Sequence, residues 1–175
     1  MRDKNANKEL SYFNSSGHYI YRYEAEENPA FQQLIPYVVI RDLSKEKFYI
    51  SKRIKGDDRL QGKLSIGFGG HLSPEDCYGE INIIYSGLKR ELSEEVYIDD
   101  SDITPSFLGY VRDLSGSTSD HLGFVFTVET NNVFIKEDDA LQGQWMMLSE
   151  LVDRYYEFEN WGRYIIDYFY ENSFL

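Results

Sequence analysis

The sequence predicts one domain of mixed helices and strands, an α/β or α+β sandwich. Short runs rich in β-branched and aromatic residues occur before, between and after two stretches with helical spacing, which indicates a sheet covered by helices. The 175 residues suit a single core, and 42% hydrophobic with 27% charged residues is typical of a globular protein. We expect residues 1–16 to form a flexible polar leader and residues 17–175 to form the domain.

The first half of the chain contains three expected strands and one long helix. Residues 37–40 are a continuous β-branched run, typical of a buried strand, and residues 47–51 form a second strand after a hairpin-length loop. A third strand is expected at residues 64–68, where it runs directly into a glycine turn. The helix is expected over residues 80–96, where apolar residues recur at helical spacing.

The second half adds short strands and a helical tail. The expected strands cover residues 107–111, 122–128, 133–135 and 145–147. The tail begins at Leu148 and contains an aromatic-rich apolar face with a spacing of three and four residues. The members of that face are Trp161, Tyr164, Ile165, Tyr168 and Phe169. We expect this face to pack on the sheet, and so many rings also leave a homodimer open.

The expected helix at residues 80–96 carries an acidic cluster, Glu91, Glu94 and Glu95. At about 100° per residue the three carboxylates share an arc of roughly 100°. Glu91 and Glu95 repel each other across one turn, and acids near a helix C-terminus oppose the helix dipole. Carboxylates that accept these costs are suited to a hard divalent cation, whereas a solvated acidic face is the simpler alternative. Helix geometry alone leaves both interpretations open.

Gly70 and the downstream run Arg90-Glu91-Leu92-Ser93-Glu94-Glu95 resemble the box of the Nudix hydrolase family. That box reads Gly, five residues, Glu, seven residues, then Arg-Glu-apolar-any-Glu-Glu-any-Gly-apolar. The resemblance implies an α/β/α sandwich with a mixed central sheet, a Mg²⁺ (or Mn²⁺) cofactor and hydrolysis of a nucleoside diphosphate linked to another moiety. The segment from Ser65 to Asp76, with Phe31 to Tyr37 ahead of it, is similar to a branch of predicted phosphoesterases whose substrates are undefined.

The resemblance also implies roles for individual residues. Glu91, Glu94 and Glu95 would be the metal ligands, with Arg90 orienting them and Glu94 as the first candidate for the general base. Gly69, Gly70 and His71 would contact the substrate, although for His71 a structural bond to the turn is an equal alternative. Further bases or ligands could come from later loops, at Asp120, Glu137, Asp138 or Asp139.

Two departures from the box affect the loop and the helix end. Nineteen residues separate Gly70 from Arg90 where the family has thirteen, so the first glutamate of the box has no single counterpart. Asp76 keeps its distance from Gly70, Asn82 keeps its distance to Arg90, and Glu80 is the nearest glutamate. Tyr97 replaces the closing glycine, which predicts a different exit from the helix.

The favoured function is hydrolysis of a phosphate anhydride in a nucleoside diphosphate derivative or similar small phosphorylated metabolite. The alternatives are a Nudix-fold sensor that binds without cleaving, a phosphomonoesterase-type activity, and an interaction domain that uses the aromatic tail. The net charge of −12 argues against a duplex nucleic acid partner, and no segment approaches the ~20 apolar residues of a membrane span. A single cysteine, Cys77, excludes an internal disulfide and suits the cytoplasm. His121 is expected to be a strand-end residue rather than a ligand.

Overall fold

The computed structural model describes residues 10, 12–13, 15–26, 28–54, 62–78, 82–99, 101, 103–115, 119–136 and 141–173. At its centre lies strand β1 (Gln33–Arg41), which is buried continuously from Ile35 to Ile40. Successive side chains of β1 enter two different hydrophobic cores, because neighbouring residues in a strand point to opposite faces. A strand buried on both faces needs a layer on each side, which explains its unbroken apolar sequence.

The central sheet is mixed. β1 pairs in parallel with β7 (His121–Glu129) and antiparallel with β4 (Gly67–Gly69). Beyond β7 lies β6 (Ser106–Val111), and on the other side β2 (Lys47–Arg53) pairs with β1 at its end. β2 is also antiparallel to β3 (Leu64–Ser65) and to β9 (Leu141–Met147).

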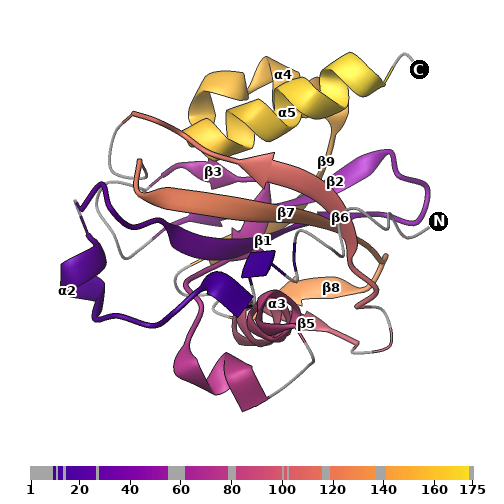
Figure 1. The fold of residues 1–175 in the computed structure, drawn as a ribbon. Coiled ribbons are helices and arrows are strands. Elements are labelled where there is room, and N and C mark those ends of the chain that lie inside the picture. Colours follow the sequence, from indigo (N-terminus) through magenta and orange to yellow (C-terminus); the bar gives the residue numbers. More distant parts are fainter. Residues whose placement is uncertain are drawn as a thin grey trace.

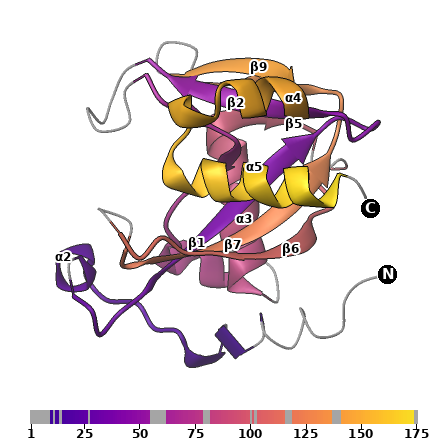
Figure 2. The same ribbon diagram turned by 90° about the horizontal axis from the view of Figure 1, so that it is seen from above.

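Helices cover both faces of this sheet, which confirms the predicted α/β/α sandwich (Figure 1). α4 (Leu148–Asp153) and α5 (Asn160–Asn172) lie on one face. The other face is covered by α3 (Ile83–Glu95) and by a small sheet of β5 (Val96–Ile98) and β8 (Val133–Ile135). Figure 2 shows α5 running across the sheet with α3 behind it. Within the described residues no helix is long and apolar enough to cross a membrane.

The N-terminal segment runs along one edge of the molecule and includes the short helix α2 (Arg22–Ala25) (Figure 1). Leu10 is fully buried in the core on the α3 face, and the ring of Phe13 packs edge-on against Phe124 with 5.0 Å between ring centroids. The expected leader at residues 1–16 therefore contributes two side chains to the core. Residues 1–9, 11 and 14 of that range lie outside the described residues.

Most expected elements are present, with differences at their ends. The expected strand at residues 64–68 is divided into β3 and β4, and the helix expected at residues 80–96 begins at Ile83, with Glu80 outside the described residues. The expected tail face was wrong for Tyr164 and Tyr168, which are 45% and 43% exposed. The buried side of α5 includes Ile166, which the predicted face left out. Its buried hydrophobic members are Trp161, Ile165, Ile166 and Phe169.

Candidate functional site

Helix α3 is held at both ends by local hydrogen bonds. Asn82 caps its start, because the side-chain Oδ1 accepts a hydrogen bond from the Ile84 backbone N–H at 2.8 Å. At its other end the chain passes straight into β5, and the Val96 backbone N–H still donates to the Leu92 carbonyl. The backbone at this exit is extended, so Tyr97 meets no requirement for a left-handed residue. The predicted change of helix exit is confirmed.

The glycine turn brings the backbone directly over the helix. A Cβ atom placed on Gly70 would lie 2.5 Å from Oε2 of Glu91, and one placed on Gly87 would lie 2.4 Å from Cδ2 of Leu72. Real Cβ atoms do not approach this closely, so glycine at both positions lets the loop and helix meet. The loop therefore lies against the carboxylate of Glu91 rather than above open solvent.

The guanidinium of Arg90 binds the loop to the acidic cluster. It donates two hydrogen bonds to Asp76, from Nε to Oδ1 at 2.9 Å and from Nη2 to Oδ2 at 3.1 Å. Nη2 also donates to the His71 carbonyl oxygen at 2.9 Å. Nη1 donates to Oε1 of Glu91 at 2.8 Å and to Oε1 of Glu94 at 3.2 Å. These acceptors raise the pKa of Arg90, with Asp76 the largest cause, so the guanidinium stays charged.

This arrangement shows how the chain accommodates six extra residues. Asp76, which keeps the family's distance from Gly70, is only 3% exposed and forms the two-bond pair with Arg90. Asn82, which keeps the distance to Arg90, caps α3 instead. With Asp76 as the bracing carboxylate, the six extra residues are 77–82. Cys77 and Tyr78 belong to the 3-10 helix η1 (Pro74–Tyr78), Asn82 caps α3, and residues 79–81 lie outside the described residues. Spacing from Gly70 pointed to Asp76, but spacing to Arg90 pointed equally to Asn82. The sequence alone did not choose between them.

The three glutamates lie in different environments. The Glu91 side chain is 13% exposed, and burial raises its pKa even though Arg90 partly opposes the shift. The Glu94 side chain is 56% exposed and shares a guanidinium nitrogen with Glu91. Glu95 is half-buried and lines a hollow that neither Glu91 nor Glu94 lines. Their assigned roles as ligands and base stay predictions.

The hollow beside Glu95 has a volume of about 140 Å³ and contains both signs of charge. Arg53 and Lys63 line it from β2 and from the approach to β3, and Glu159 lines it from the start of α5. Oε1 of Glu159 accepts hydrogen bonds from the hydroxyl of Tyr37 at 2.9 Å and from that of Ser65 at 2.8 Å. Sequence analysis did not single out Arg53, Lys63 or Glu159, since their segments are adjacent only in the folded chain.

His71, His121 and Asp120 lie together beside the loop that follows β4. His71 Nε2 lies 3.1 Å from His121 Nε2, and His121 Nδ1 lies 2.7 Å from Oδ1 of Asp120. Gln33 donates to the other oxygen of Asp120 at 2.8 Å. Burial lowers the pKa of His71 to about 4, so its ring is uncharged at neutral pH. His121 stands at the start of β7, and it is also half of a histidine pair that the sequence did not indicate.

The remaining late-loop candidates are Glu137, Asp138 and Asp139, which lie outside the described residues. Lys136, the last described residue before them, donates its backbone N–H to the Glu95 carbonyl at 2.9 Å. Asp120 is on the histidine side of the loop and is already engaged by His121 and Gln33.

The donors at the end of α3 fit a magnesium ion in kind. All are carboxylate oxygens, which hard divalent cations prefer, and burial raises the pKa of Glu91, a shift that a bound cation would oppose. In the part of the chain that the structure describes, no three acidic, histidine or cysteine side chains converge closely enough to hold an ion. Arg90 takes up one oxygen each of Glu91 and Glu94, and the exposed Glu94 can rotate without unpacking the core.

Comparison with known proteins agrees with this geometry. No family model matches the chain. The chain is 34% identical over 156 residues to the protein YmaB of Bacillus subtilis, covering 83% of this chain and 75% of YmaB. The structure of Tm1382, provisionally assigned to the Nudix hydrolases, superposes with a TM-score of 0.75 at 30% identity, over 93% of this chain and 83% of that one.

More distant structures share the fold alone. A MutT protein from Methanosarcina mazei Go1 superposes with a TM-score of 0.59 at 17% identity, over 82% of this chain and 96% of that one. The protein DR0079 from Deinococcus radiodurans superposes with a TM-score of 0.62 at 14% identity, over 85% of this chain and 88% of that one. With the Arg90-centred box, the α/β/α sandwich and these relatives together, the chain belongs to the Nudix hydrolase family.

Proposed function

We propose that the protein is a Mg²⁺-dependent hydrolase that cleaves a phosphate anhydride bond in a nucleoside diphosphate derivative or a similar small phosphorylated metabolite. The observation that carries the proposal is the position of Arg90. This residue fixes the Asp76 loop and two of the three box glutamates at one end of α3. The fold alone would not require such an array, because a scaffold needs no cluster of like charges.

The proposed metal ligands are Glu91, Glu94 and Glu95, with Mn²⁺ as a substitute ion. When bound, the ion would supply Lewis-acid stabilisation of the negative charge that builds on the phosphate oxygens as the anhydride breaks. Arg90 keeps two of the carboxylates close to the loop and holds their orientation. Gly70 has no side chain, so the Glu91 carboxylate can lie directly against the backbone of the turn.

The hollow beside Glu95 is the proposed phosphate subsite. Arg53 and Lys63 are two cations lining it in a protein of net charge −12, and phosphate oxygens are natural partners for both. Ser65 lies in the same hollow and already donates a hydrogen bond to Glu159. A substrate with two linked phosphates would thus meet carboxylates through the cofactor on one side and cationic side chains on the other.

Glu94 is the proposed general base. Its carboxylate is the most exposed of the three, and only one of its oxygens is engaged by Arg90. A base has to reach the attacking water and accept its proton, which an exposed carboxylate oxygen beside the ligand cluster can do. His71 has a positioning role in this scheme, because its carbonyl holds Arg90 and its ring faces His121.

Turnover separates this proposal from its alternatives. The purified protein is incubated with Mg²⁺ and with nucleoside diphosphate derivatives, dinucleoside polyphosphates and simple phosphomonoesters, and released phosphates are identified by ³¹P NMR. We expect cleavage of an anhydride that falls by at least about 100-fold in Glu95→Gln and Glu94→Gln. Glu171→Gln, an exposed glutamate on α5, is the matched control and should retain full activity.

Two outcomes would contradict the proposal. Turnover of phosphomonoesters alone would favour a phosphomonoesterase. Tight binding of a nucleotide derivative without turnover would favour a sensor. This outcome also requires that Glu95→Gln binds Mg²⁺ as the wild type does, measured by calorimetry.

A further inference from the structure

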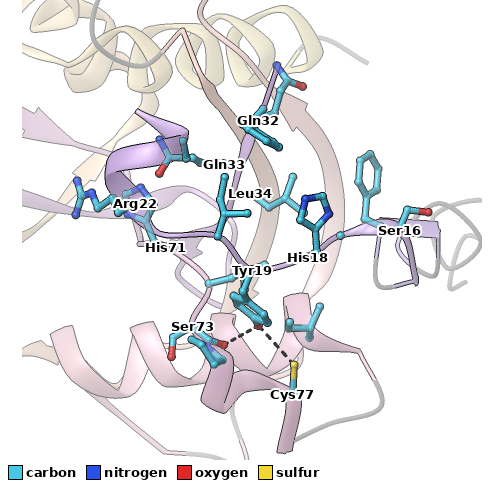
Figure 3. A pocket seen from close by; sticks show the side chains of 18 of the residues that line it. Ser16, His18, Tyr19, Arg22, Gln32, Gln33, Leu34, His71, Ser73 and Cys77 are labelled. Carbon is cyan, nitrogen blue, oxygen red and sulfur yellow. Dashed lines mark hydrogen bonds between the residues drawn. The ribbon is translucent and has the colours of Figure 1, made fainter. Parts of the chain in front are cut away.

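A cavity of about 700 Å³, lined by none of the box glutamates, lies beside the N-terminal segment (Figure 3). Its walls come from the N-terminal segment, from the start of β1 and from the loop between β4 and α3. The volume falls within the range of about 300–1,000 Å³ that is typical of small-molecule sites. Of the residues that line it, only His71 has a role in the proposed hydrolytic reaction, through the carbonyl that accepts from Arg90.

The cavity is distinct from the metal end of α3. Ile83, the first residue of the helix, lines the cavity, while Glu95 is the last residue of the same helix. At 1.5 Å per residue these two positions are separated by roughly 18 Å along the helix axis. Arg90 lies between these two residues along the helix and pairs with Asp76 of the loop. None of the box glutamates lines the cavity, so a ligand there would not touch them.

The charge of the cavity differs from that of the rest of the molecule. The whole chain has a net charge of −12, yet none of the described residues that line the cavity is an aspartate or glutamate. Arg22, on α2, is its lining cation, and the guanidinium pairs on the surface with Glu26 at 2.8 Å. That exposed pair is weak, so Arg22 can exchange it for an anion without a large cost. The cavity thus favours a ligand with negative charge.

Aromatic and uncharged polar groups make up much of the remaining wall. Phe31 and His18 both line the cavity and pack edge-on with 6.1 Å between ring centroids, so the wall offers aromatic surface to a flat ring. His71 lines the cavity as a neutral ring that is fixed by its contact to His121 at 3.1 Å. A neutral imidazole can hydrogen-bond a heteroaromatic edge without adding charge.

The cavity wall is also connected to the box loop. The hydroxyl of Tyr19 donates to the Ser73 carbonyl at 2.7 Å and lies 3.6 Å from the sulfur of Cys77, as the dashed lines in Figure 3 show. The Ser73 backbone N–H in turn donates to the Asp76 carboxylate at 2.8 Å. The loop on either side of Asp76, the residue that pairs with Arg90, therefore forms part of the cavity wall.

We propose that this cavity is a second binding site, for a planar heteroaromatic ring that carries an anionic group. Phe31 and His18 face the ring, Arg22 binds the anion, and His71 hydrogen-bonds the ring edge. The site belongs to an effector or to a compound bound independently of the metal, and it does not depend on the hydrolytic activity.

Isothermal titration calorimetry of the full chain in EDTA tests this proposal. The probes are adenosine 5′-monophosphate, guanosine 5′-monophosphate and pyridine-3-carboxylate, with adenosine and inorganic phosphate as arms that carry only the ring or only the anion. We expect one-site binding of at least one complete probe tighter than about 1 mM, and at least about tenfold weaker binding of both arms. The ring ¹⁵N resonances of His71 and His121 should shift on binding.

Variants locate the site. Arg22→Gln and Phe31→Ala should each weaken binding by roughly tenfold, since a charge-assisted hydrogen bond or a stacked ring is lost. Glu26→Gln is the matched control, because it breaks the same ion pair but leaves the guanidinium in place, and its affinity should be equal or higher. Thermal unfolding of each variant shows whether it is folded.

Some results would overturn the proposal. No saturable binding of any complete probe up to about 10 mM would do so. Binding that survives Arg22→Gln and Phe31→Ala but is lost in Arg53→Gln would place the ligand in the phosphate subsite instead. Because the titration is made without a divalent metal, failure of the hydrolytic proposal would leave the expected binding unchanged.

Discussion

The two sides of the loop between Gly69 and Asp76 differ in charge. On one side, the carboxylates of Glu91 and Glu94 gather around a single guanidinium and lie at the end of α3. On the other, His71 is kept neutral beside a cavity without a lining carboxylate among the described residues. One loop thus lies between the proposed metal site and the proposed anion site, and Arg90 contacts this loop through Asp76 and the His71 carbonyl.

The largest effect is expected where the two sides are joined. Arg90→Met leaves the carboxylate of Asp76, which is 3% exposed, without its charged partner. We expect the free energy of unfolding to fall by about 3–5 kcal/mol, measured by chemical denaturation, and any hydrolytic activity to be lost. The double variant Arg90→Met with Asp76→Asn should recover part of that stability but no activity. Equal stability of the single variant and the wild type would show that the two sides are not joined through this pair.

The histidine side should lose stability in acid. The pKa of His71 is lowered to about 4 from an ordinary value of 6.5, mainly by burial, so the unfolded chain binds the extra proton first. The free energy of unfolding is therefore not reduced by His71 above pH 6.5, and it falls as the pH drops from 6.5 toward 4. Allowing for the partly exposed ring, His71→Gln should remove roughly 1–2 kcal/mol of this acid-induced loss of stability. His18→Gln is the control, and an unchanged curve for His71→Gln would contradict the assignment.

The acidic side should respond to pH in the opposite sense. Burial raises the pKa of Glu91 above its ordinary value of 4.5, so the folded chain holds this proton longer than the unfolded chain does. Stability from this group is present below pH 4.5 and is lost as the pH rises through the raised pKa of the folded state. Glu91→Gln should remove that loss, and Mg²⁺ should offset it in the wild type only. Denaturation at stepped pH, with and without Mg²⁺, measures both, and a stabilisation by Mg²⁺ that persists in Glu91→Gln would argue against Glu91 as a ligand.

The smallest effect is expected at the exit of the acidic helix. Tyr97→Gly restores the residue type of the family box, but the chain here is extended and Tyr97 pairs across the small sheet with Phe134. We expect a loss of about 0.5–1 kcal/mol in the free energy of unfolding, with metal affinity unchanged. A gain in stability would mean that the helix prefers a left-handed cap after all.

Local patterns predicted much of the fold. The β-branched run at residues 37–40 indicated a buried strand, because period-two burial on both faces leaves no polar position. The hairpin after it and the helix carrying Arg90 follow from equally local signals. The face of α5 was less accurate at Tyr164 and Tyr168, since large amphipathic rings satisfy the spacing rule whether they lie inside the core or at its rim.

The acidic cluster was recognisable from the sequence by itself, because Glu91, Glu94 and Glu95 are close along one helix and local geometry brings them together. Tertiary structure decided everything that depends on residues far apart in the chain. It selected Asp76 over Asn82 as the partner of Arg90, placed Arg53 and Glu159 beside Glu95, and joined His71 to His121 across fifty positions. Spacing specifies neighbours within a helix or strand, whereas contacts between distant segments are set by how the sheet and its covering layers pack.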